Sequence, residues 1–327
     1  MKVIQVGIGG MGQVWLQTVH DAPEVEFAGF VEISDAVIEA QVIRFGLDRG
    51  LIFKTLDEAL KAVHADGVIN VTPPQFHQDV SIRALEAGIP VLSEKPLAPT
   101  LAEAQAIVDA SNRTGVLHMV TQNYRYSVAA QTLKKALDPA VVGAISSVAT
   151  VFFKGPHFGG FREEMAYPLI VDMSIHHFDM LRFFLDADPV SVFGRSWNPP
   201  WSWFKGDASA SALIQFGGGA TATYTGSWCA TGNETPWNAD WRFDCEQGVV
   251  TLINDQVWFY PRDSNAAPRR IEPVTMPLTA QAYLLHEFSE AVTDGVAPTT
   301  TCQDNIKSLA IVCNLVESFQ TGNVVKM

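Results

Sequence analysis

The chain has 327 residues, of which 47% are hydrophobic and 17% charged, and its formal net charge is −13. This length predicts two domains with ample apolar core, and the spread of the charges is typical of a folded globular protein. Nucleic-acid binding relies on clustered Lys and Arg side chains that attract phosphates, and the sequence contains no such cluster. We therefore expect no nucleic-acid partner. No apolar run approaches the roughly 18 residues of a membrane span, so we expect no membrane association.

A strand-and-glycine pattern begins at residue 2, which leaves no room for a signal peptide and predicts a cytoplasmic protein. The four cysteines lie far apart and include no CxxC pair, so neither a zinc site nor a disulfide framework is indicated. We therefore expect reduced, buried thiols and no structural metal at Cys229, Cys245, Cys302 and Cys313.

Strand and helix patterns alternate over residues 1–121. Apolar, often β-branched runs predict strands at residues 2–6, 24–32, 67–71, 91–93 and 117–121. Helical patterns occupy the intervals, two of them opened by the capping-box sequences at Thr55 and Thr100. Apolar strands that alternate with helices require a parallel sheet covered on both faces. Residues 1–121 are therefore predicted to form an α/β domain with a doubly wound parallel sheet, the architecture of the Rossmann fold.

The pattern changes after residue 121, because strand-like runs now dominate. They fall at residues 142–153, 190–197, 208–216, 220–228, 241–244, 249–253 and 257–260. Three glycines at 217–219 indicate a hairpin between two of these runs. Helical patterns lie at residues 127–137, 167–185, 280–294 and 303–321. We predict that residues 122–327 form a second, α+β domain with a large, mainly antiparallel open sheet.

A glycine loop joins the first strand to the first helix, in the sequence Gly7-Ile8-Gly9-Gly10-Met11-Gly12. In a GxGxxG loop the first glycine permits a tight turn, the second admits a pyrophosphate and the third lets helix and strand pack closely. Glu32 follows about 20 residues later at the end of the second strand, where a carboxylate accepts ribose hydroxyls and repels a 2′-phosphate. The pattern predicts NAD as the cofactor, in preference to NADP. The alternative for the glycine loop is a turn that binds no ligand. The alternative for Glu32 is a surface glutamate at the end of a strand.

Two more loops follow strands whose carboxyl ends should meet the same edge of the sheet. One contains Thr72 and Pro73 with His77 close behind, and the other contains Glu94 and Lys95. Open α/β sheets bind their ligands at this edge, so we expect all five residues to line the cofactor site. The alternative for Lys95 is an exposed charge after a strand.

Asp172, His176 and Asp179 are spaced i, i+4, i+7 in an apolar helical run, which predicts one shared helix face. Carboxylates and an imidazole are costly to bury unless they are paired or used. An Asp–His pair one turn apart fixes the imidazole tautomer and raises its basicity, as a general acid/base requires. The alternatives are a satisfied core histidine and a metal site, although no further cluster supplies the remaining metal ligands. His177 points to the opposite face and is predicted to be structural.

These motifs occur in a fixed order: GxGxxG, Glu-Lys-Pro about 80 residues later, and Asp-x-x-x-His-x-x-Asp about 80 residues beyond that. The whole chain resembles the glucose–fructose oxidoreductase and inositol dehydrogenase family, the Gfo/Idh/MocA oxidoreductases. The resemblance implies an N-terminal Rossmann domain and a C-terminal domain whose open sheet builds homodimers or homotetramers.

The resemblance also implies roles for individual residues. Lys95 corresponds to the active-site lysine beside the nicotinamide, His176 to the general acid/base, and Asp172 to its orienting partner or a substrate ligand. The family's substrate-pocket segment matches Asn123, Tyr124 and Arg125, and substrate contacts that vary among members fall on the loop with His157 and Arg162.

The expected function is hydride transfer between NAD and a secondary alcohol of a sugar, inositol or related polyol. One alternative is a hydrolase or lyase that retains NAD and oxidises a sugar carbon only transiently. Another is a non-catalytic dinucleotide-binding sensor, although a sensor has no need of Lys95, Asp172 and His176 together.

Overall fold

The computed structural model describes residues 1–327, which pack as two compact units. The first comprises Met1–Asn123 and Leu278–Ile306, and the second comprises Tyr124–Pro277 and Lys307–Met327. The predicted boundary near residue 121 lies close to the first crossing between them. The sequence did not reveal that the chain returns to the first unit at residues 278–306.

The first unit holds a six-stranded sheet in which every strand pair is parallel, with strand order β3-β2-β1-β4-β5-β6. Its strands are β1 (Lys2–Val6), β2 (Glu26–Val31), β3 (Ile52–Phe53), β4 (Gly67–Asn70), β5 (Val91–Ser93) and β6 (His118–Val120). This order is that of the doubly wound dinucleotide-binding fold, whose ligands bind where the strand order reverses, here between β1 and β4.

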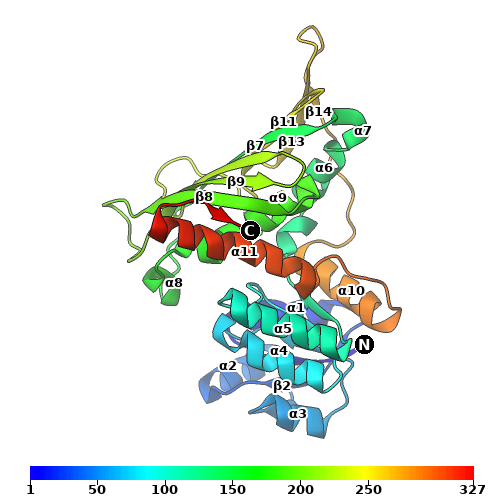
Figure 1. The fold of residues 1–327 in the computed structure, drawn as a ribbon. Coiled ribbons are helices and arrows are strands. Elements are labelled where there is room, and N and C mark those ends of the chain that lie inside the picture. The colour runs from blue at the N-terminus through cyan, green and yellow to red at the C-terminus, as the bar shows by residue number, and fades with distance from the viewer. The chain divides into compact units, whose positions relative to one another are not determined.

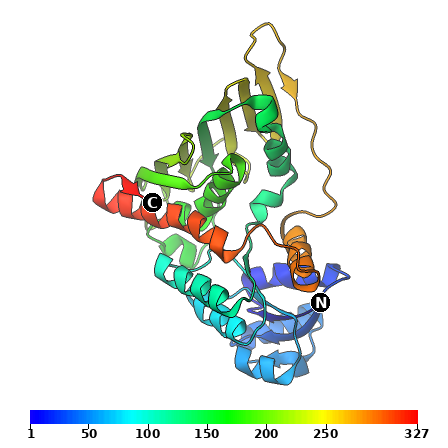
Figure 2. The same ribbon diagram turned by 45° about the vertical axis from the view of Figure 1, so that its right-hand side comes forward.

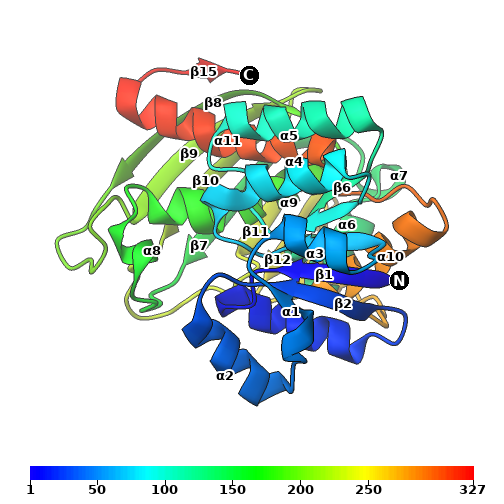
Figure 3. The same cartoon turned by 90° about the horizontal axis from the view of Figure 1, so that it is seen from below.

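Helices cover both sides of this sheet, as the predicted alternation requires. Figure 3 shows α1 and α2 on one side and α4 and α5 on the other. The helices of this unit are α1 (Gly10–Asp21), α2 (Asp35–Phe45), α3 (Leu56–Ala62), α4 (His77–Glu86), α5 (Leu101–Thr114) and α10 (Ala280–Thr293). Thr55 opens α3 with a complete capping box, as predicted. α10 packs against α1, so the returning segment adds a helix to the same layer.

The second unit is built on a nine-stranded mixed sheet, with strand order β14-β13-β12-β11-β7-β10-β9-β8-β15. Its strands are β7 (Ile145–Phe153), β8 (Pro189–Trp197), β9 (Ser209–Phe216), β10 (Thr221–Ser227), β11 (Asp240–Cys245), β12 (Gly248–Ile253), β13 (Gln256–Pro261), β14 (Arg269–Arg270) and β15 (Val325–Lys326). Only β7 and β10 pair in parallel, and the glycines at 217–219 form the predicted hairpin between β9 and β10. The α/β fold class with a mainly antiparallel second sheet is thereby confirmed.

Helices lie on one face of the nine-stranded sheet (Figures 1 and 2). They are α6 (Val128–Ala136), α9 (Ser174–Leu185) and the larger part of α11 (Cys302–Thr321), while α7 (Pro139–Val142) and α8 (Phe161–Glu164) are short. Strand residues that face these helices, such as Tyr224 and Phe243, are fully buried. Alternate residues point to the opposite face, where Val151, Leu213 and Ile253 are about 40% exposed.

The predicted helix at residues 167–185 is not continuous. It begins with a π-helical turn, Leu169–Met173, and becomes the α-helix α9 only at Ser174. The Ser174 hydroxyl donates to the Leu169 carbonyl, across the wider turn. A π-turn changes the angular step between residues and is common at functional sites, and sequence periodicity does not reveal it.

None of the helices has both the length and the apolar character needed to cross a bilayer.

Candidate functional site

The glycine loop is held tightly against the sheet of the first unit. Gly7 has φ +89°, and a Cβ on it would lie 2.7 Å from the Val71 carbonyl oxygen. A Cβ on Gly12 would lie 2.5 Å from the Gly7 carbonyl oxygen, so helix α1 approaches the loop as closely as backbone allows. The Gln5 amide donates to the Gly7 and Gly12 carbonyls at 3.0 and 2.8 Å. Both positions therefore require glycine, as the motif predicts.

The same loop leaves space where an anion would approach. A Cβ on Gly10 would meet no other group within 4 Å, and a Cβ on Gly9 would meet only the tip of Val37, at 4.0 Å. α1 starts at Gly10, and no side chain caps its first N–H groups. Uncapped N–H groups at a helix N-terminus favour a pyrophosphate, so this loop fits the dinucleotide that the sequence predicts.

Glu32 lies beside the glycine loop. Its carboxylate accepts hydrogen bonds from the Ile8 N–H at 3.2 Å and the Ser34 N–H at 2.9 Å, and the residue is half-buried. The nearby Lys54 ammonium is paired with Asp35 at 2.6 Å. An oriented carboxylate next to the loop fits recognition of ribose hydroxyls.

Glu94 connects the Glu-Lys-Pro loop to helix α1. One carboxylate oxygen accepts from the Trp15 indole N–H at 2.8 Å, and the other accepts from the Lys95 N–H at 3.1 Å. Trp15 is fully buried and Glu94 is 8% exposed. Its carboxylate thus positions the loop that carries Lys95, and the expected contact of Glu94 with the cofactor stays a prediction. Sequence reasoning missed Trp15, because its partner lies 79 residues away.

His77 connects the loop that contains Thr72 to the loop that contains Pro96. Its Nδ1 lies 2.7 Å from the Pro96 carbonyl oxygen, and its Nε2 lies 2.8 Å from that of Thr72. The side chain is fully buried, and direct contact with the cofactor is not what this geometry supports. The Thr72 hydroxyl in turn donates to the Asn70 side-chain oxygen at 2.7 Å, which fixes the turn that carries Pro73. Lys95 is half-buried on the loop that His77 anchors.

In the second unit, Asp172 lies in the π-helical turn and accepts a hydrogen bond from the Arg162 Nε at 2.6 Å. Their side chains are 14% and 32% exposed. A partly buried carboxylate is thus paired with a guanidinium from the loop at residues 154–168, whose substrate role the sequence analysis predicts.

His176 lies four residues further on and stacks on Tyr124, with ring centroids 4.2 Å apart and planes 24° apart. Burial raises the pKa of Tyr124, and the negative charge of Asp172 raises it further. The Tyr124 hydroxyl therefore stays protonated, and the charge effect indicates that Asp172 is near it. Tyr124, which was predicted separately as part of the substrate pocket, therefore contacts His176 and lies near Asp172, the predicted acid/base and its partner.

His177 belongs to the core, as predicted. Its ring nitrogens contact the Tyr224 hydroxyl at 3.2 Å and the Trp237 carbonyl at 3.0 Å, and it is fully buried. Tyr224 also accepts from the Ser174 hydroxyl at 2.9 Å. These bonds seat α9 on strand β10.

Arg125 and Asp179 form a buried ion pair. Nε and Nη2 of Arg125 donate to the two Asp179 oxygens at 2.5 and 2.7 Å, and the side chains are 7% and 1% exposed. The Ser308 hydroxyl donates to Asp179 at 2.8 Å. Arg125 therefore has a structural use that the sequence did not reveal, and its predicted substrate contact stays a prediction.

The remaining predicted contacts differ in exposure. His157 is exposed and stacks on Trp203 with centroids 3.8 Å apart, while Asn123 is half-buried at the start of a 3₁₀ turn. No group of three His, Cys, Asp or Glu side chains is arranged to hold a metal ion.

Buried histidines make the stability of the fold depend on pH. Burial lowers the pKa of His118 to about 3 and that of His177 to about 4. The unfolded chain takes up these protons below about pH 6.5 and the folded chain does not, so stability is fully present above that pH and is lost as the pH falls towards 4.

We expect the free energy of unfolding to fall by about 1.4 kcal/mol per pH unit for each of these histidines between pH 6 and 4. Urea titrations at pH 7 and pH 5 measure this loss. His177→Gln is expected to reduce the pH dependence, and the exposed His64→Gln to leave it unchanged. Equal pH dependence in His177→Gln and the wild type contradicts the assignment.

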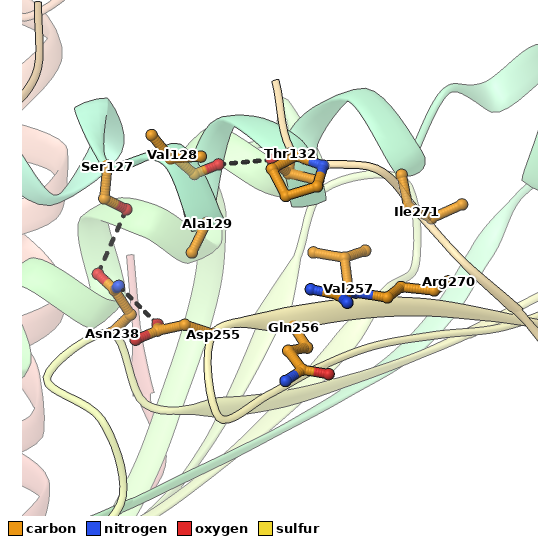
Figure 4. A pocket seen from close by; sticks show the side chains of 11 residues that line it. Ser127, Val128, Ala129, Thr132, Asn238, Asp255, Gln256, Val257, Arg270 and Ile271 are labelled. Carbon is orange, nitrogen blue, oxygen red and sulfur yellow. Dashed lines mark hydrogen bonds between the residues drawn. The ribbon is translucent and has the colours of Figure 1, made fainter. Parts of the chain in front are cut away.

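A pocket of about 320 Å³ lies elsewhere in the second unit, between α6 and the strands β13 and β14 (Figure 4). None of the predicted binding or catalytic residues lines it. It is lined by Ser127, Val128, Ala129, Thr132, Asn238, Asp255, Gln256, Val257, Arg270, Ile271 and Pro273.

The fold and the glycine loop define a dinucleotide-binding protein of the Rossmann class. Residues 1–122 match the model of the oxidoreductase family with an NAD-binding Rossmann fold, and residues 130–251 match the Gfo/Idh/MocA C-terminal domain. The chain belongs to the Gfo/Idh/MocA oxidoreductase family.

Several named proteins resemble the chain over most of its length. The scyllo-inositol 2-dehydrogenase (NAD(+)) of Bacillus subtilis is 28% identical over 83% of this chain and 80% of its own. The D-apiose dehydrogenase of Paraburkholderia graminis is 26% identical over 98% of this chain and 88% of its own. An Agrobacterium radiobacter oxidoreductase, solved with NAD+, L-tartaric acid and magnesium, superposes with a TM-score of 0.90 at 20% identity, covering 100% of this chain and 98% of its own.

Proposed function

We propose that this protein transfers a hydride between NAD and a secondary alcohol of a sugar, inositol or related polyol. One observation carries the proposal: the His176 ring stacks on Tyr124, which lies near Asp172, in a chain whose glycine loop and Glu32 fit a dinucleotide. The named relatives that act on inositol and apiose support this substrate class.

NAD supplies the hydride acceptor, and the residues of the chain handle the proton and the charge. His176 accepts the hydroxyl proton as the carbinol C–H bond breaks and the carbonyl forms. The Lys95 ammonium stabilises the negative charge that develops on the oxygen, an interaction that is strongest where water is excluded. Asp172 orients His176, and the Tyr124 ring fixes the plane of the imidazole.

Two other functions use parts of the same site. An NAD-retaining hydrolase or lyase needs the same acid/base and lysine but regenerates its NAD in each turnover. A dinucleotide-binding sensor needs only the glycine loop and Glu32. The presence of His176, Asp172 and Tyr124 as one group favours catalysis over the sensor.

The position of Glu32 predicts the choice of cofactor. NAD is expected to bind at least tenfold more tightly than NADP, about 1.4 kcal/mol or more, because the 2′-phosphate would meet the Glu32 carboxylate. Calorimetric titration with both dinucleotides measures the ratio. Glu32→Gln is expected to reduce the ratio of NAD affinity to NADP affinity. The matched exposed variant Glu39→Gln is expected to leave this ratio unchanged. Equal affinity in the wild-type protein removes Glu32 from this role.

We also propose that the protein forms a homodimer or homotetramer through the open face of the nine-stranded sheet. That face presents Val151, Leu213 and Ile253 to solvent, and a stable interface hides such apolar side chains. Sedimentation at micromolar concentration is expected to give a mass above that of one chain, and Leu213→Lys is expected to lower it. A monomeric wild-type protein contradicts this proposal.

A further inference from the structure

Arg162 is held in a fixed orientation by three groups. Its Nε donates to the Asp172 carboxylate at 2.6 Å. Its guanidinium carbon lies 5.3 Å from the Phe158 ring centroid and 4.8 Å from that of Phe161. Apolar rings beside a guanidinium reduce its hydration and strengthen its interaction with an anion.

The two terminal nitrogens of Arg162 remain available. Nε is the nitrogen that bonds to the protein, and no hydrogen bond joins Nη1 or Nη2 to another protein atom. The side chain is 32% exposed, so this edge of the guanidinium can reach a ligand. Two parallel N–H donors in one plane match the two oxygens of a carboxylate.

The neighbouring charged groups are already engaged. Lys154 pairs with Glu234 at 2.8 Å, and Lys205 pairs with Glu164. Glu163 accepts from the Gly159 N–H at 2.9 Å. Arg162 differs from both lysines because its remaining donors, Nη1 and Nη2, are fixed in one plane, whereas an ammonium offers no such paired donors. A single guanidinium among several carboxylates suits a carboxylate monoanion better than a phosphate dianion, which requires more cations.

Asp172 places this edge near the proposed reaction centre. The negative charge of Asp172 raises the pKa of Tyr124, and the Tyr124 ring stacks on His176 with centroids 4.2 Å apart. Arg162 and His176 are thus linked through Asp172 and Tyr124, an arrangement in which one substrate molecule presents its anion to Arg162 and its hydroxyl to His176. We propose that Arg162 binds the carboxylate of the substrate, which is a sugar acid of the uronic or aldonic type. This inference rests on the proposed function, which it narrows from sugars and polyols to their acids.

The test compares acids with their neutral counterparts by calorimetric binding to the NAD-loaded protein. The pairs are D-glucuronate with D-glucose, D-galacturonate with D-galactose, and D-gluconate with D-glucitol, and D-glucose 6-phosphate is the phosphate probe. In at least one pair the acid is expected to bind at least tenfold more tightly than its neutral partner. Arg162→Gln is expected to abolish this preference, and Arg162→Lys, which keeps the charge but loses the paired donors, to reduce it.

Lys205→Gln is the matched control, because Lys205 is an exposed cation of the same region that is paired with Glu164. It is expected to keep the full acid preference. The inference is overturned if no acid binds more tightly than its partner, if glucose 6-phosphate binds more tightly than every acid, or if Arg162→Gln retains the preference.

NADH formation, followed in parallel, separates the two proposals. If an acid binds through Arg162 but no NADH forms, the anion site is supported and the dehydrogenase is refuted. If neutral polyols are oxidised and no acid is preferred, the dehydrogenase is supported and the anion site is refuted.

Discussion

Replacing His176 with alanine is expected to lower kcat by roughly 10²–10⁴, the usual contribution of a positioned general acid/base. The affinity for NAD should change little, because His176 lies in the second unit and the glycine loop and Glu32 in the first. Steady-state kinetics together with an NAD titration measure both quantities.

Lys95→Ala is expected to cause a loss of similar size. The two losses should not add in the double variant, because both residues act on one transition state. The matched control is His177→Gln, which alters the neighbouring core histidine and is expected to lower stability while its folded fraction keeps kcat. Full activity of His176→Ala would remove the proposed acid/base.

Replacing Arg125 with methionine is expected to destabilise the fold by roughly 3–5 kcal/mol, because it leaves the Asp179 carboxylate buried without its guanidinium. The double variant Arg125→Met, Asp179→Leu should recover most of this loss, since a buried ion pair is readily replaced by apolar side chains. Urea unfolding of the three proteins measures the differences.

The exposed pair of Arg49 and Glu39 is the matched control, because both of its side chains are 56% exposed. Arg49→Met should cost no more than about 1 kcal/mol. If Arg125→Met costs no more than Arg49→Met, the buried pair does not have the structural role that its geometry indicates.

Local sequence patterns were sufficient to predict the structural features that depend on residues close together in the chain. The glycine loop, the Thr55 capping box and the alternation of strands and helices follow from backbone geometry over a few residues, and the structure has each of them. Glu32 lies beside the loop because the end of β2 is fixed by the parallel pairing of β1 with β2.

Contacts between distant residues could not be read from the sequence. Glu94 meets Trp15 across 79 residues, and Arg125 meets Asp179 across 54. The identity of a residue in a motif does not show whether its side chain contacts a ligand or another part of the protein. Glu94, His77 and Arg125 were therefore assigned to ligands without the protein contacts that the structure gives them. The spacing of Asp172, His176 and Asp179 suggested one helix face, and the π-helical turn at Leu169–Met173 changed that geometry.

The measurement that tests the central proposal most directly is the absorbance of NADH, followed while the protein is incubated with NAD and a panel of sugars, polyols and sugar acids. Hydride transfer predicts that one NADH forms for each substrate molecule consumed, and that His176→Ala abolishes the signal. Substrate consumed without accumulating NADH would indicate an NAD-retaining hydrolase or lyase. A panel in which no compound is consumed, by a protein that binds NAD tightly, would contradict the dehydrogenase account and favour a sensor.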